Sequence, residues 1–284
     1  MTRFAVPAAR YETDLFEEFT EAFRPVFARA DQFRRFRIYL RGLLEPGERK
    51  NVEAIAARAA PGESGESDLA QALQHFISHS PWDAGRVFAA TRRTLRKRHG
   101  DSGGRWVIHD AAFPKKGWHS VGVQRQFARA LGRKVNCQIG VVVSHCGPAG
   151  FFPLVARLYL PGHWLREYGE LAEKLVPAEH RRPATKAEIA LALVDELLAD
   201  GGAPAPSQIA TDPGYATAHD LLAGVRARGL SRTDAPVALA EAHRRFDALR
   251  TTLGIDHFEG RTWAGWHHHV SVAFAAAAFL ATEG

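Results

Sequence analysis

Histidine is the residue type in this sequence with the widest chemical scope. The chain has 14 histidines, and a neutral imidazole can act as a general base or as a ligand for a transition metal. His109 ends a short apolar run, His119 lies in a predicted loop, and His145 lies in a β-rich run. The three histidines at 267–269 fall in a predicted apolar helix. For these three we expect packing and capping roles, not metal binding.

Cysteine use, apolar content and the start of the chain all favour a reducing, cytoplasmic location. Cys137 and Cys146 are nine residues apart without a CxxC motif, so we expect two small buried apolar side chains and no disulfide. The first 19 residues carry early acids and lack the apolar segment of an export signal. The longest apolar stretch, at 270–281, is too short to cross a bilayer, so we expect no membrane association.

Basic residues exceed acidic residues, 37 against 31, which gives a net charge of +6. This excess permits an anionic partner without requiring one. Two basic runs fall on predicted helices, and their members are Arg34, Arg35, Arg37 and Arg41 in the first and Arg92, Arg93, Arg96, Lys97 and Arg98 in the second. A nucleic-acid-binding surface and an ordinary solvated helix face both have this pattern, and the sequence leaves the two open.

The hydrophobic periodicity changes near residue 100. Apolar residues three and four apart predict helices within 10–60 and again within 68–99, with a loop of proline, glycine and serine at 60–67. Short apolar runs follow at 105–109 and 207–211 and longer β-rich runs at 135–146 and 151–160, all of which predict strands.

Helices alternate with the later strands. Thr185 and Glu188 form a predicted capping box at the start of a helix. Further helices are predicted at 219–229, 238–254 and 262–283. This order predicts a helical N-terminal region at 1–100 and an α/β core with a mixed sheet at 101–284.

Seven strings in the chain are similar to one protein family. They are LRGLLEPGERKN (40–51), LQHFISHSPWD (73–83), FPKKGWHSVGVQRQF (113–127), GRKVNCQIGVVVS (132–144), LYLPGHW (158–164), TDPGYATAHDLLAGVRARGL (211–230) and GIDHFEGRTWAGWHHHV (254–270). Together they resemble the DDE-type insertion-sequence transposases. The resemblance implies an α/β fold with an RNase H-like mixed-sheet core and flanking helices, preceded by an all-α N-terminal region.

The resemblance also places three catalytic positions. The family binds Mg²⁺ through two aspartates and a glutamate, because hard cations prefer carboxylate oxygens. Aligned on the strings above, these positions fall on His109, Asp212 and His243. A shift of one residue at the first position gives Asp110, and a shift of two at the third gives Glu241.

The same comparison indicates a degenerate member of the family. Transposases of this type carry a long DNA-gripping insertion between the second aspartate and the glutamate. Here only the residues 213–242 separate Asp212 from His243. We therefore expect that this chain does not transpose.

Two imidazoles and one carboxylate are the ligands of the facial triad that holds non-haem Fe(II). The alignment therefore predicts iron at His109, Asp212 and His243, and an O₂-dependent oxygenase or oxidase acting on a small metabolite. A 2-oxoglutarate cosubstrate is compatible with such a site, but no arginine clamp for it is evident in the sequence. The same ligands also suit a zinc-dependent hydrolase, which is the first alternative.

Two further alternatives keep nucleic acid as the partner. One is a Mg²⁺-dependent transposase or nuclease that uses Asp110, Asp212 and either Glu241 or Glu259. The other is an inactive remnant that binds DNA without cleaving it. Four residues near the predicted site are candidates for orienting a ligand or contacting substrate, namely Glu259, Lys115, His119 and His145. The sequence gives no indication of the oligomeric state.

Overall fold

The N-terminal part of the chain is helical, as predicted. The computed structural model describes residues 13–59, 68–101, 103–216 and 218–283, so the predicted loop at 60–67 lies outside the described residues. The helices of the N-terminal part are α1 (Thr13–Glu21), α2 (Ala30–Leu44), α3 (Val52–Arg58), α4 (Leu69–Ser78) and α5 (Ala84–His99). A short 3-10 turn, η1 (Arg24–Val26), follows α1. Asn51, Asp68 and Asp83 each accept a backbone N–H at the start of a helix, which ends the preceding loop.

A mixed sheet of five strands forms the core. The strands are β1 (Arg105–Pro114), β2 (Gln124–Ala128), β3 (Arg133–Gly147), β4 (Gly150–Tyr159) and β5 (Gln208–Thr211). The order is β2-β3-β1-β5, and β4 pairs with the later part of β3. β1 runs antiparallel to β3 and parallel to β5. The two predicted β-rich runs form the antiparallel strands β3 and β4, which are joined by a tight turn between Gly147 and Gly150.

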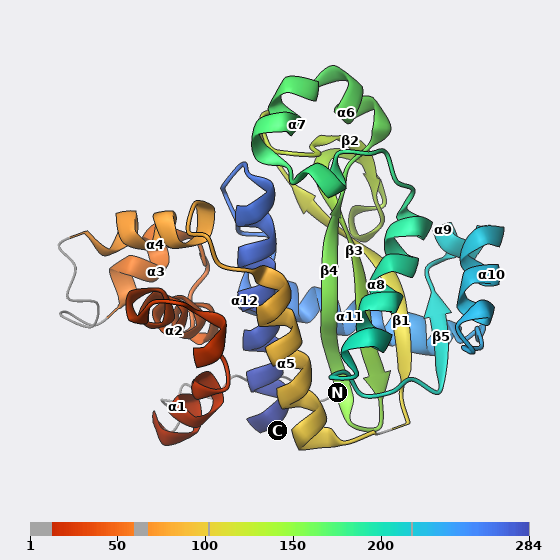
Figure 1. The fold of residues 1–284 in the computed structure, drawn as a ribbon, viewed down its shortest axis with the longest axis horizontal. Coiled ribbons are helices and arrows are strands. Elements are labelled where there is room, and N and C mark those ends of the chain that lie inside the picture. Colours follow the sequence, from red (N-terminus) through yellow and green to blue (C-terminus); the bar gives the residue numbers. More distant parts are fainter. Residues whose placement is uncertain (1–12, 60–67, 102, 217, 284) are drawn as a thin grey trace.

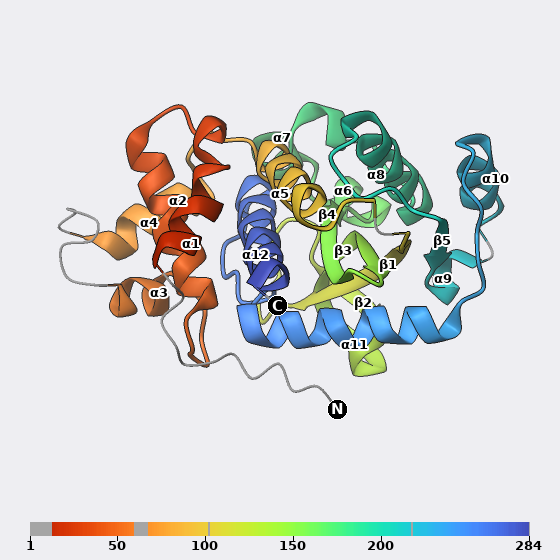
Figure 2. The same cartoon turned by 90° about the horizontal axis from the view of Figure 1, so that it is seen from below.

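Helices cover both faces of this sheet (Figures 1 and 2). The helix α11 (Pro236–Leu253) crosses one face, and α8 (Lys186–Asp200) and α5 lie on the other. The predicted capping box is confirmed, because the Thr185 hydroxyl accepts the Glu188 N–H and the Glu188 carboxylate accepts the Thr185 N–H. The fold is therefore the expected α/β arrangement, an RNase H-like mixed-sheet core with flanking helices.

The last helix, α12 (Trp263–Glu283), lies between the N-terminal helices and the sheet (Figure 1). It contacts β4 and α5 as well as α2 and α4. The remaining short elements are η2 (Arg129–Leu131), α6 (Gly162–Glu167), α7 (Gly169–Leu175), η3 (Ala178–His180), α9 (Pro213–Ala216) and α10 (His219–Ala227). Among the described helices, the 21-residue α12 included, none has both the length and the apolar content needed to cross a bilayer.

Candidate functional site

Two aspartates lie in contact where β5 ends beside the parallel strand β1. β5 ends at Thr211, whereas β1 continues to Pro114, so the edge of β1 beyond this point is not paired with β5. The Asp212 N–H donates to the Ile108 carbonyl at 2.9 Å, which extends the pairing by one residue. The Asp110 N–H then donates to Asp212 Oδ2 at 3.1 Å. In α/β sheets, ligands bind outside the carboxyl ends of strands at such a position.

A cavity of about 670 Å³ opens at this point of the sheet. Its walls come from β1, β2 and β3, from Asp212 and α9 directly after β5, from the start of α8 and from the second half of α11. The charged residues that line it are Asp110, Arg129, Lys186, Asp212, Asp247 and Arg250. Tyr215, Phe127 and Phe246 are the aromatic residues in its wall. We call this cavity the strand-end cleft.

The Asp110 carboxylate binds two protein donors. Tyr215 donates its hydroxyl to Oδ1 at 2.6 Å, and the Lys186 ammonium forms an ion pair with Oδ2. Burial raises the pKa of Tyr215 well above its usual value, and the negative charge of Asp110 raises it further. Tyr215 is therefore a hydrogen-bond donor to Asp110 throughout the physiological pH range.

The Asp212 carboxylate is more deeply buried than that of Asp110 and faces three donors. His243 Nε2 lies 2.6 Å from Oδ1, the Asp110 N–H binds Oδ2, and the Arg129 guanidinium lies 3.7 Å from Oδ2. Burial alone would raise the pKa of Asp212. The His243 ring and the Asp110 N–H outweigh this effect, so the pKa of Asp212 is below its usual value and the carboxylate is ionised.

His109 lies on the opposite side of β1 from Asp110 and is only 1% exposed. Its Nε2 is hydrogen-bonded to the Ser144 hydroxyl at 3.0 Å. Its ring centroid lies 4.9 Å from that of Phe246 and 5.8 Å from that of His243. Burial lowers the pKa of His109 to about 3, so the ring is neutral. His109 is not among the residues that line the strand-end cleft.

The structure thus brings the three aligned positions near one another without making one ligand set. Asp212 and His243 are in direct contact, and His109 packs against His243, but His109 Nε2 is committed to Ser144. Within the described residues, no group of three or more His, Cys, Asp or Glu side chains is placed to hold a metal ion. Metal binding by His109, Asp212 and His243 stays a prediction.

Three of the four additional candidates lie together in a second cavity. Lys115, His119 and Glu259 line a cavity of about 500 Å³ between the loops that follow α2, β1 and α11. The Lys115 ammonium donates to the Phe258 carbonyl, and burial lowers the pKa of Lys115 to about 8. His145 lies elsewhere, stacked on Phe152 with ring centroids 4.6 Å apart. The structure places none of these four residues in the strand-end cleft.

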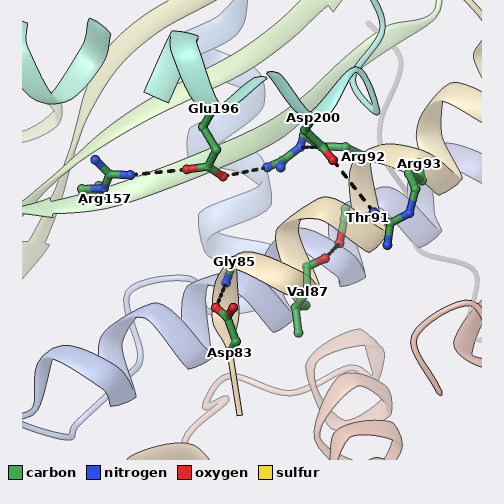
Figure 3. A network of polar contacts seen from close by, with 9 residues as sticks. All are labelled: Asp83, Gly85, Val87, Thr91, Arg92, Arg93, Arg157, Glu196 and Asp200. Atoms are coloured by element: carbon green, nitrogen blue, oxygen red, sulfur yellow. Dashed lines mark hydrogen bonds and ion pairs between the residues drawn. The ribbon is translucent and has the colours of Figure 1, made fainter. Parts of the chain in front are cut away.

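Several arginines of the two basic runs pair with acids of the same chain. Arg92 is 1% exposed and binds Glu196 and Asp200 of α8, as Figure 3 shows. Figure 3 also shows Arg93 beside Asp200. In the other run, Arg35, Arg37 and Arg41 pair with Asp31 or Glu17. A structural role therefore accounts for the paired arginines, whereas Lys97 and Arg98 at the end of α5 are exposed and form no ion pair with the described residues.

The structure is thus an α/β protein with a mixed RNase H-like sheet and two aspartates in contact at the strand ends. The model of one family, described as DDE superfamily endonuclease, matches residues 17–245. The chain belongs to this family, and the resemblance to DDE-type transposases is confirmed at the level of the family. The chain has no significant match among curated proteins or among solved structures.

Membership of this family implies divalent metal ions such as Mg²⁺, but the side chains at the strand-end cleft do not fit such ions as they are arranged. Mg²⁺ requires oxygen ligands and keeps several water molecules. Asp110 is bound by Lys186 and Tyr215, and Asp212 by His243, which stands where the alignment places the glutamate. Protein side chains thus take the places that metal ions would take beside these carboxylates.

Proposed function

We propose that this protein binds nucleic acid, with the phosphodiester backbone seated at the strand-end cleft. The cleft carries Arg129, Lys186 and Arg250 around Asp110 and Asp212. This combination of strand-end aspartates and cations in one cavity, in a chain of the DDE superfamily, is the observation that carries the proposal. Asp247 also lines the cleft and pairs with Arg250, so the three cations equal the three carboxylates in number. Arg129 lies 3.7 Å from Asp212 and is 36% exposed, and it is the cation to which we assign phosphate binding, in a salt-dependent way.

Fluorescence anisotropy of the full chain tests this proposal. The probe is a labelled DNA duplex with a single-stranded tail, so that either form of DNA can bind. Affinity should fall steeply as the salt concentration rises, and the Arg129→Gln variant should bind more weakly, with a salt slope smaller by about one. Arg93→Gln is the matched control. Arg93 of α5 pairs with Asp200 at the end of α8, and neither residue lines the strand-end cleft. Absence of binding, or equal effects of the two variants, contradicts the proposal.

Phosphodiester cleavage is the second candidate function, and the family match favours it directly. Asp110 lies on β1 and Asp212 directly follows the neighbouring strand β5, and the Asp110 N–H donates to Asp212 Oδ2. Nicking of supercoiled DNA in the presence of Mg²⁺ or Mn²⁺, abolished in Asp212→Asn, would establish cleavage. Binding without nicking in either metal would leave the protein a non-cleaving nucleic-acid binder.

The prediction of an iron oxygenase with a small-molecule substrate has no support in the family match. His109 Nε2 is hydrogen-bonded to Ser144, so His109 could bind a metal there only if this bond broke, and otherwise only through Nδ1. The same holds for zinc at these residues. Anaerobic purification followed by metal analysis tests both predictions, since either requires about one metal ion per chain that is lost in His109→Ala and His243→Ala.

A further inference from the structure

The hairpin formed by β2, η2 and the start of β3 is an exposed surface that combines cations with an aromatic ring. We propose that it binds unpaired bases of single-stranded nucleic acid, by stacking on Phe127 while the neighbouring cations hold the phosphates. This inference rests on the proposed function and specifies the form of nucleic acid that the protein prefers.

The cations of this hairpin differ from those of the basic helices. Residues 124–134 contain four basic residues, Arg125, Arg129, Arg133 and Lys134, and no acidic residue. All four are exposed. In the part of the chain that the structure describes, Arg125, Arg133 and Lys134 form no ion pair, and Arg129 approaches only Asp212. Their charge is therefore available to an anionic partner, unlike that of Arg92.

Phe127 is a large, solvent-exposed aromatic residue beside these cations. Its exposed fraction is 57%, and it lines the strand-end cleft. It pairs across the strands with Lys134, and directly opposed residues of an antiparallel pair share one face of the sheet. A ring next to a cation on an exposed edge can stack on a base while the cation binds the adjacent phosphate.

A second exposed aromatic residue lies in the loop that is bound to this hairpin. Asn136, paired with Arg125, donates its side-chain N–H groups to the carbonyls of Lys115 and Gly117 at 3.0 Å and 2.8 Å. Trp118 follows Gly117 directly and is 55% exposed. The hydrogen bonds of Asn136 therefore attach the loop that carries Trp118 to the hairpin that carries Phe127.

Stacking requires bases with a free face, which a duplex offers only at its ends. A duplex would satisfy the cations but would leave Phe127 and Trp118 unused. The exposed rings of the hairpin and of its bound loop, beside these cations, therefore favour a single strand. Bases of a single strand can stack on exposed rings while its phosphates bind the cations.

The experiment compares three labelled ligands of equal length bound to the full chain: a single strand, its duplex and an abasic strand with phosphates but no bases. The single strand should bind most tightly. Phe127→Ala should weaken its binding roughly five-fold or more and leave binding of the abasic strand unchanged. Phe127→Trp should retain the affinity. Arg125→Gln should weaken all three ligands and reduce the salt dependence, whereas Arg93→Gln should change none.

Each outcome separates this inference from the proposed function. If none of the ligands binds, the proposed function itself fails. If they bind but Phe127→Ala has no effect, or weakens the abasic strand equally, base stacking at this residue is wrong and the nucleic-acid site stands. A preference for the duplex over the single strand overturns the inference in the same way.

Discussion

At the scale of single residues, His269 shows how burial couples the stability of this fold to pH. Its Nδ1 accepts the Tyr39 hydroxyl at 2.9 Å, and its Nε2 lies 3.1 Å from the carbonyl oxygens of Gly254 and Ile255. The side chain is fully buried, and burial lowers the pKa of His269 to about 4. The native state therefore holds the neutral ring, joined to both α2 and the end of α11.

The sign of the pH dependence follows from this lowered pKa. In the unfolded chain a histidine has a pKa of about 6.5, so the stability that His269 contributes is present above that pH. It is lost as the pH falls from about 6.5 to the folded-state pKa of about 4. Between pH 7.5 and pH 5.5 the free energy of unfolding should fall by about 1.3 kcal/mol from this residue alone.

Urea denaturation of His269→Gln at the two pH values measures this contribution. Other buried histidines titrate in the same direction, so the informative quantity is the difference between the variant and the parent chain. The variant should be less stable at pH 7.5 and should lose less stability on acidification. The exposed His219 provides a matched control, as His219→Gln. A parent and a His269→Gln variant with equal pH dependence would contradict the assignment.

The strand-end cleft shows how far residue-level reasoning reaches from sequence. Asp212 is predictable from the resemblance to the transposases, because the second aspartate of that family aligns with it on Gly214 and Tyr215. The role of Asp110 is not, because alternation along a strand turns neighbouring side chains to opposite faces and suggests that only one of His109 and Asp110 matters. β5 is too short to cover β1 beyond Thr211, so the cleft opens beside Asp110, whereas His109 does not line it.

At the scale of elements, a buried ion-pair cluster joins α5 to α8. Only 2% of the Arg92 side chain is exposed, with Nε 2.9 Å from Asp200 and Nη1 3.3 Å from Glu196. Glu196 also pairs with Arg157 of β4 at 3.3 Å (Figure 3). Removing one member of such a cluster leaves the other charges partly buried without their partner.

Arg92→Met should therefore lower the free energy of unfolding by about 2–4 kcal/mol, because methionine fills the space but supplies no charge. Arg93→Met should change it by at most about 0.5 kcal/mol, since 60% of the Arg93 side chain is exposed and its ion pair is solvated. Urea denaturation of both variants gives the comparison. If the two variants lost similar amounts of unfolding free energy, the ion pairs of Arg92 would be no more stabilising than a solvent-exposed ion pair.

Elements with a strong periodic pattern were predictable, and those defined by their partners were not. The helices α8 and α12 and the strand β5 agree with the sequence pattern. β1 runs ten residues rather than the five of its apolar run, because β3 pairs with it along its whole length, through Asp110 and the small residues Ala111 and Ala112. β2 has an exposed, polar sequence, and its strand conformation depends on pairing with β3.

At the scale of the whole molecule, α12 makes one core of the helical region and the sheet. Phe279 of α12 packs on Phe16 and Phe19 of α1, with ring centroids 5.8 Å and 5.2 Å apart. Near its other end, Trp266 packs edge-on against Phe113 of β1 at 5.1 Å. One continuous cluster of buried apolar residues contains all of these side chains. The predicted division at residue 100 therefore runs through a shared core.

A shared core predicts cooperative unfolding across that division. If α12 separates from the N-terminal helices or from the sheet, apolar surface that it covered is exposed to water. Neither part is therefore expected to be stable alone. Hydrogen exchange followed by mass spectrometry at increasing urea concentration should show amide protection in α2 and in β1 disappearing at the same urea concentration. Peptides from the short peripheral helices α6 and α10 should exchange earlier, because they make fewer contacts with this core. Loss of protection in α2 at clearly lower urea than in β1 would show instead that residues 1–100 form a separate domain, and α12 would then belong to the sheet alone.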